Sequence, residues 1–164
     1  MDRSHFSRFG GSVYARLVSI TQGWFLRHFS EHPYIVATAA PFLFLFATVL
    51  VRKFAPDAKG SGIPQVLEAI EAGKNPTHAE QAWRSPLVSI RTAVIKVLSS
   101  FVGILGGASI GREGPTVQIA ASLFSSVGRV VRRYAPDVEL PSYPTAGAAA
   151  GVAAAFNAPL AGIT

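Results

Sequence analysis

The chain has 164 residues, of which 49% are hydrophobic and 15% are charged, and its mean hydropathy is +0.35, a balance that favours a membrane protein over a soluble globule. The formal net charge is +6, but the lysines and arginines are scattered and form no basic stripe with interleaved aromatics, so nucleic-acid binding is not expected. There is no cysteine, and the four histidines have no ligand spacing, which excludes a disulfide framework and argues against a metal site or a redox cofactor.

Residues 1–33 make up the N-terminal part of the chain. Their longest apolar run, LVSITQGWFL, has only ten residues and is followed by no small-residue cleavage site, so the segment is not a signal peptide. We expect an amphipathic or truncated helix here that ends near His28. The pair His32-Pro33 predicts the break before the next helix, because a residue that precedes proline is disfavoured in the helical conformation.

The first long apolar run predicts a transmembrane helix. From Tyr34 to Val51 there are eighteen residues without a charge, and Arg52 and Lys53 close the run. At about 1.5 Å per residue, such a helix crosses most of a hydrocarbon core of roughly 30 Å.

Three further uncharged runs lie at 97–111, 114–128 and 140–164. The first two are short, and the third is interrupted by Pro141, Pro144 and Pro159. Short apolar segments broken by glycine and proline are typical of the discontinuous helices of transporters.

The middle of the chain alternates loops and helices. Residues 54–64 are rich in glycine and proline and predict a loop, after which Pro64 opens a short helix that ends at Gly73. Residues 74–84 are polar and are expected outside the hydrocarbon, and a long helix is predicted from about Pro86 to Gly107.

Glycines recur every four residues at the end of this long helix, at Gly103, Gly107 and Gly111. On a continuous helix this spacing would place them on one face and let a second helix approach closely.

Three motifs share one pattern, in which glycine or asparagine precedes a proline that would lie in the first turn of a helix: GSGIP at 60–64, GREGP at 111–115 and FNAPLAG at 156–162. In the third motif Asn157 is the predicted N-cap. The first backbone N–H groups of a helix lack partners and the helix dipole is positive there, so several helix starts that converge on one cavity would form an anion site without any lysine.

Each motif also has a purely structural interpretation. GSGIP could be a turn with Ser61 as a cap, and GREGP could be an interfacial pair of Arg112 and Glu113. A carboxylate between apolar runs is nevertheless costly, and intramembrane acids are usually functional. For the alanine and glycine run before FNAP, tight helix packing through Gly147 and Gly151 is the better interpretation.

An enzyme is not expected. GASIG at 107–111 matches the pattern of a hydrolase nucleophile with Ser109, but no histidine follows Ser109 to complete a triad. FNAP differs in order from the Asn-Pro-Ala motif of water channels, which also pair half-helix starts.

The three motifs together resemble a known family. GSGIP (60–64), GREGPTVQIA (111–120) and GAAAGVAAAFNAPLAGI (147–163) resemble, in order and spacing, the three signature segments in the first half of a CLC chloride channel or chloride/proton antiporter. LVRKFAPDAKGSGIPQ (50–65) and Lys96, fifteen residues before Gly111, resemble the bacterial members. The similarity runs from roughly Val36 to Thr164.

The resemblance implies a role for individual residues. Ser61 matches the serine whose hydroxyl donates to the central anion, and Glu113 matches the gating glutamate, which occupies an anion position when ionised and leaves it when protonated. The implied anion-binding residues are Ser61, Gly62, Ile63, Gly111, Arg112, Glu113 and Gly114.

The resemblance also implies an all-α polytopic membrane protein of CLC type with tilted, discontinuous helices. Residues 34–164 would hold the first inverted repeat only, incomplete at the C-terminus. The implied function is selective transport of chloride, and secondarily of other anions, by a voltage-gated channel or a chloride/proton antiporter, with no cofactor. A homodimer in contact with membrane lipid, in the bacterial inner membrane, is expected. The alternative is a truncated, non-conducting membrane subunit that acts only in assembly.

Overall fold

The computed structural model describes residues 13–74, 85–134, 142–156 and 158. Within these residues the chain is helical and has no β-strand, which confirms the predicted all-α class. The described elements in chain order are α1 (Val13–Glu31), α2 (Pro33–Phe54), the short 3-10 helix η1 (Pro56–Ala58), α3 (Ile63–Lys74), the 3-10 helix η2 (Pro86–Val88), α5 (Ile90–Leu105), α6 (Glu113–Tyr134) and α7 (Ser142–Phe156).

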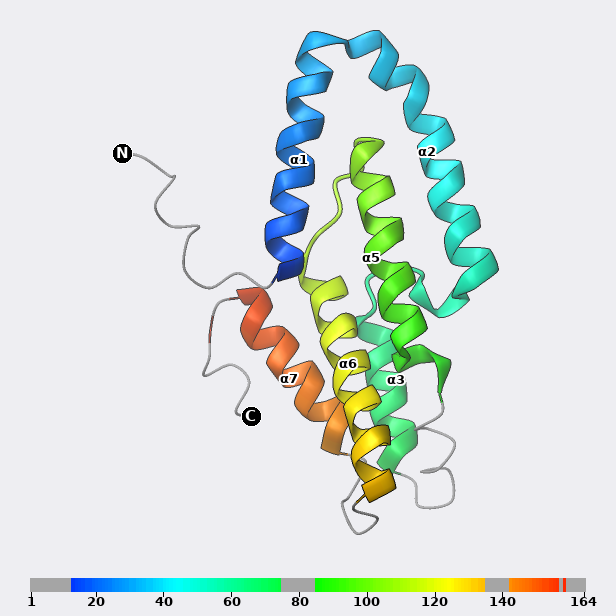
Figure 1. Cartoon of the computed structure of the whole chain (residues 1–164), viewed down its shortest axis with the longest axis vertical. Coiled ribbons are helices and arrows are strands. Elements are labelled where there is room, and N and C mark those ends of the chain that lie inside the picture. Colours follow the sequence, from blue (N-terminus) through cyan, green and yellow to red (C-terminus); the bar gives the residue numbers. More distant parts are fainter. Residues whose placement is uncertain (1–12, 75–84, 135–141, 157, 159–164) are drawn as a thin grey trace.

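The first two helices form a long hairpin with α5 between them (Figure 1). As predicted, the turn is at His32, and Pro33 occupies the first position of α2, where its missing N–H costs nothing. Tyr14 and Val18 of α1 pack with Ile104 of α5 in a buried cluster. The N-terminal helix is thus joined to the rest of the described chain by apolar packing.

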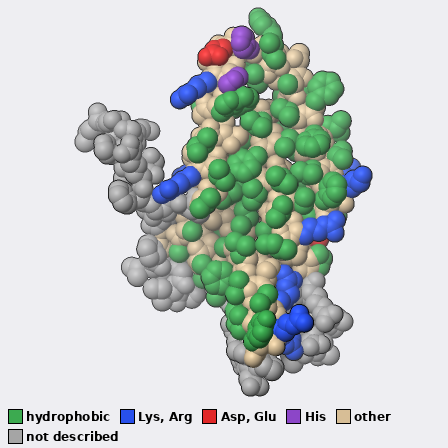
Figure 2. Space-filling view, viewed as in Figure 1, with side chains coloured by type: hydrophobic (Ala, Val, Ile, Leu, Met, Phe, Trp, Pro, Cys, Tyr) green, Lys and Arg blue, Asp and Glu red, His purple; other side chains and the backbone are tan. Residues whose placement is uncertain are grey.

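The second helix has the length and composition of a membrane span. Among the described residues it is the one helix long and apolar enough to cross a bilayer, and the most apolar part of it is not buried within the molecule. Figure 2 shows hydrophobic side chains spread across the described surface on the face in view, with lysines and arginines toward its edges. A surface of this kind suits a hydrocarbon surrounding better than water.

The helix predicted from Pro86 to Gly107 is divided. Pro86–Val88 forms a separate 3-10 turn, and α5 begins only at Ile90. The reason is Ser89, whose backbone is extended and whose hydroxyl oxygen accepts a hydrogen bond from the Thr92 N–H at 3.1 Å. Ser89 is therefore the N-cap of α5, which satisfies one of the unpaired donors of its first turn.

The prediction that Gly103, Gly107 and Gly111 share one helix face is wrong, although Gly107 does lie close to another helix, since a Cβ atom there would come within 2.9 Å of the Phe25 side chain of α1. Helix α5 ends at Leu105, and Gly107 has a φ of +89°, a left-handed conformation that glycine adopts readily and that terminates helices. Gly103 alone of the three lies on the helix, and a Cβ atom there would come within 3.0 Å of the Ile110 side chain. Gly103 thus leaves space for the side chain of Ile110, in the segment that follows α5, and not for a second helix.

The prediction of close packing through Gly147 and Gly151 is confirmed. Helices α6 and α7 contact each other more extensively than any other pair of described elements. A Cβ atom at Gly147 would lie 2.8 Å from the Ala121 Cα, and one at Gly151 would lie 2.7 Å from the Val117 Cα. The two helix backbones approach so closely that only glycine fits at these positions. The FNAP motif that follows, with Asn157 and Pro159, lies outside the described residues.

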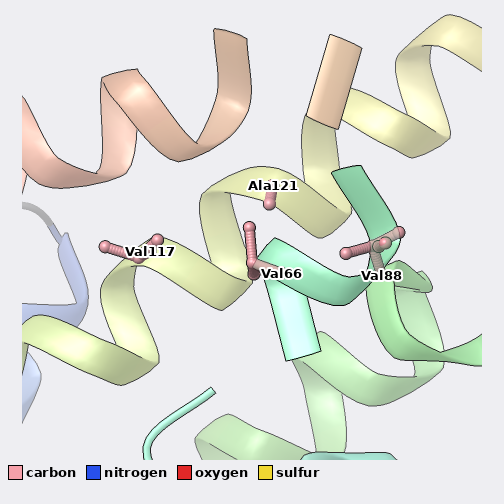
Figure 3. Packing of buried hydrophobic residues seen from close by; sticks show 5 residues of the cluster. Val66, Val88, Val117 and Ala121 are labelled. Atoms are coloured by element: carbon pink, nitrogen blue, oxygen red, sulfur yellow. The ribbon is translucent and has the colours of Figure 1, made fainter. Parts of the chain in front are cut away.

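Helix α3 is held against α6 by a small apolar core, shown in Figure 3. Val66 of α3 and Val88 of η2 are 2% and 1% exposed, and they pack with Val117 and Ala121 of α6. This cluster fixes α3 beside α6 just after the first turn of each helix. It therefore sets the distance between the starts of the two helices.

Candidate functional site

Helix α3 begins in the GSGIP motif, as predicted. Gly60 and Gly62 have φ values of +66° and +99°, so the loop makes two turns that favour glycine. The carbonyl of Gly62 accepts the first helical hydrogen bond, from the Val66 N–H at 3.1 Å. Among the described residues, the N–H groups of Ser61, Gly62 and Ile63 donate to no backbone carbonyl, as expected at a helix start.

Helix α6 begins in the GREGP motif in the same way. The Arg112 carbonyl accepts hydrogen bonds from the Thr116 N–H at 3.2 Å and from the Thr116 hydroxyl at 2.6 Å. Within the described part of the chain, the N–H groups of Arg112, Glu113 and Gly114 have no backbone acceptor. Pro115, in the first turn, has no N–H to satisfy.

The starts of α3 and α6 are in direct contact. Both helices begin in the middle of the molecule and run downward in Figure 1. Gly114 faces the backbone of Ser61, and Gly62 faces the side chain of Gln118 one turn further along α6, where a Cβ atom would come within 2.8 Å of the Gln118 Cβ. The structure thus brings together Ser61, Gly62 and Gly114 of the predicted site.

Glu113 is the first residue of α6 and is half-buried. Its carboxylate lies next to Gly111, since a Cβ atom at position 111 would be 3.0 Å from Glu113 Oε2. The carboxylate is thus at the positive end of the α6 dipole, where a negative charge is stabilised.

A cavity of about 200 Å³ adjoins Glu113. Gly111 and Arg112 line it from the α6 side, and both residues are exposed. The opposite wall comes from α1, with Val18, Ser19 and Gln22. No feature of the sequence had predicted that this N-terminal helix would lie beside Glu113. Ile63 is also exposed and does not line this cavity.

Two polar side chains beside the site were not predicted as part of it. Gln118 is fully buried, and its Nε2 donates to the carbonyl oxygens of Asp57 and Leu87, at 3.1 Å each. Lys96 is also buried and lines a second cavity of about 680 Å³, together with Gly60 and residues of α2. The sequence did contain a feature that could have indicated both residues. A glutamine or a lysine within an apolar run needs hydrogen-bond partners when it is buried.

In the described residues no group of three or more His, Asp or Glu side chains lies close enough together to hold a metal ion. The predicted site residues supply backbone N–H groups, the Ser61 hydroxyl, the Glu113 carboxylate and the guanidinium group of Arg112, which lines the cavity beside Glu113. Donors of this kind suit an anion.

The chain also matches a family of known proteins. A family model described as voltage gated chloride channel matches residues 43–164, well over half of the chain. The matched range contains most of α2 and the starts of both α3 and α6.

Proposed function

The chain belongs to the voltage-gated chloride channel family, and we propose that it carries chloride across a membrane through a site at the starts of α3 and α6, with Glu113 as the gate. Members of this family are transporters and not enzymes. The observation that carries the proposal is the contact between Ser61 and Gly114, which holds two helix starts side by side.

The two helix starts supply the attraction for chloride. Each has the equivalent of about half a positive charge and several N–H groups that point away from the helix. Because α3 and α6 start next to each other, the two partial charges act on the same small volume. The Ser61 hydroxyl adds one donor that can approach a small spherical anion closely.

In this proposal Glu113 competes with chloride for these donors. Its carboxylate is itself an anion at the first residue of α6, and it lies beside Gly111 next to the small cavity. Protonation removes the charge and with it the attraction to the helix start. The occupant of the site, carboxylate or chloride, would then depend on the proton concentration.

The remaining parts of the proposal come from the family resemblance. They are a multi-pass arrangement in a bacterial inner membrane, contact with membrane lipid, a homodimer, and exchange of protons for chloride. Light scattering of the detergent-solubilised protein would give the number of copies in the assembly.

Chloride transport is tested with purified protein in liposomes. Liposomes loaded with potassium chloride receive valinomycin, and one electrode follows chloride release while a second follows pH. We expect release of chloride but not of the bulky anion gluconate. Proton uptake into the liposomes, in the direction opposite to chloride release, would identify an antiporter. Chloride release without proton uptake would identify a channel. Chloride release no faster than from protein-free liposomes would contradict the proposal.

A further inference from the structure

Four consecutive backbone carbonyls directly before the start of α3 all accept hydrogen bonds from side-chain nitrogen atoms. The bonds are Gln118 Nε2 to Asp57 O at 3.1 Å, Lys96 Nζ to Ala58 O at 2.8 Å, Gln65 Nε2 to Lys59 O at 2.8 Å, and Lys96 Nζ to Gly60 O at 2.7 Å. We refer to the three side chains Lys96, Gln65 and Gln118 as the carbonyl clamp. Its members come from α5, α3 and α6, so the clamp ties one loop to three helices.

Lys96 makes two of these bonds, including the shortest, at 2.7 Å to the Gly60 carbonyl oxygen. Its side chain is 3% exposed, and burial of an ammonium group is costly unless its donors are satisfied. Ala58 and Gly60 supply two acceptors, and each bond from a charged donor is stronger than one from a neutral amide. The short distances indicate that the loop is closed around the ammonium group.

The two glutamines bind carbonyls of the same segment. Gln118 is fully buried, and Gly62 packs against it so closely that a Cβ atom at position 62 would lie 2.5 Å from Gln118 Oε1. Gln65 lies in the first turns of α3 and reaches back to the loop that precedes its own helix. The segment therefore has little freedom to rotate its peptide groups.

The orientation of these peptide groups matters for an anion. A carbonyl oxygen is the negative end of the peptide dipole, and it repels chloride where an N–H group attracts it. Carbonyl oxygens bound to the clamp cannot turn toward the start of α3. The site is then left with N–H groups and the Ser61 hydroxyl in fixed positions, which is the condition for discrimination between anions of different size.

We infer that Lys96 is a positioning residue that, with Gln65 and Gln118, fixes the loop 57–60 and so sets the preference for chloride over larger anions. This inference rests on the proposed chloride transport. In this inference Lys96 affects anion selectivity by holding the Ala58 and Gly60 carbonyls in place. A direct attraction between its positive charge and the anion is not the cause. A neutral member of the clamp, Gln65, should therefore affect selectivity in the same direction as Lys96.

The test compares Lys96→Met and Gln65→Leu with the control Lys59→Met. Lys59 lies in the same loop and lines the same cavity as Lys96, but its side chain is exposed, so its replacement removes a charge and leaves the clamp intact. Two quantities are measured for each variant. One is hydrogen exchange of the Ala58 and Lys59 amides, which are bonded to Ala55 O and Pro56 O in the parent. The other is the ratio of chloride to nitrate flux in liposomes.

We expect Lys96→Met to accelerate exchange at Ala58 and Lys59 by about tenfold or more, since hydrogen bonds from a charged donor are lost. The chloride to nitrate ratio should fall in Lys96→Met and in Gln65→Leu and stay at the parent value in Lys59→Met. If Lys96→Met does not fold, Gln65→Leu alone carries the test.

Two results would overturn the inference. Unchanged exchange in both clamp variants would show that the loop is held in another way. The second result is a chloride to nitrate flux ratio that falls equally in Lys96→Met and Lys59→Met and is unchanged in Gln65→Leu. It would show that the loss of positive charge, and not the loss of the clamp, lowers the selectivity. Absence of flux in the parent would instead contradict the proposed function, and the exchange measurement would still decide whether the clamp holds the loop.

Discussion

Gly114 lies directly against Ser61, so that a Cβ atom at position 114 would come within 2.6 Å of the Ser61 carbonyl oxygen and 3.0 Å of its Cβ. A Cβ atom and a carbonyl oxygen do not approach to 2.6 Å without displacement of one of them, and a backbone carbonyl cannot move aside as a flexible side chain can. The first turn of α6 and the loop before α3 are thus in contact through a position that only glycine can occupy.

Gly114→Ala is therefore expected to push the two helix starts apart. Overpacking of this kind costs about 1–3 kcal/mol, and the loss should lower the unfolding temperature in detergent as well as the chloride flux. The matched control is Gly23→Ala on α1, where a Cβ atom would meet nothing within 4 Å. Alanine should stabilise that helix slightly, because it restricts the unfolded chain more than glycine does. Equal stability and flux in Gly114→Ala and the parent would refute this account of the contact.

Gly147→Val is expected to separate α6 from α7. A Cβ atom at this position would lie 2.7 Å from the Phe124 Cβ and 2.8 Å from the Ala120 carbonyl oxygen, so the larger side chain cannot be accommodated without movement of the helix. We expect a destabilisation of about 1–3 kcal/mol or more in thermal unfolding. Ala150→Val is the control, since Ala150 is exposed on the same helix. Similar unfolding temperatures for the two variants would argue against close packing at Gly147.

Ser61→Ala is expected to lower the chloride to nitrate flux ratio. The exposed Ser61 hydroxyl is a compact donor that favours a small halide, and without it the selection is left to backbone N–H groups, which also suit larger anions. Ser61→Thr keeps a hydroxyl and should therefore retain most of the preference for chloride over nitrate. Ser30→Ala, which removes an exposed hydroxyl on α1, serves as the control. A ratio that is the same in Ser61→Ala and the parent would remove Ser61 from the list of anion ligands.

The helix starts could be predicted from the sequence because their signals are local. In both GSGIP and GREGP a proline follows the point where the helix begins, and α3 and α6 start within these motifs. The same holds for the break at Pro33. A proline restricts its own residue and the one before it, so no information about distant parts of the chain is needed.

The contacts that assemble the site could not be predicted in this way. Gln118 binds carbonyls 61 and 31 residues away, and Lys96 binds carbonyls 38 and 36 residues away. Such pairs depend on how the helices pack, which one sequence does not specify. The spacing of Gly103, Gly107 and Gly111 was misleading for a related reason. A period of four has meaning only while the helix continues, and the left-handed turn at Gly107 ends it.

The central claim, that Glu113 is a protonatable gate at a chloride site, is tested most directly by the pH dependence of chloride flux in liposomes. The measurement compares the parent with Glu113→Gln and with Glu68→Gln, an exposed carboxylate on α3. In the parent and in Glu68→Gln we expect the flux to rise as pH falls, because a protonated Glu113 no longer competes with chloride for the start of α6. In Glu113→Gln the neutral amide cannot titrate, so the flux should persist and be the same at every pH. A pH dependence in Glu113→Gln equal to that of the parent would contradict the account.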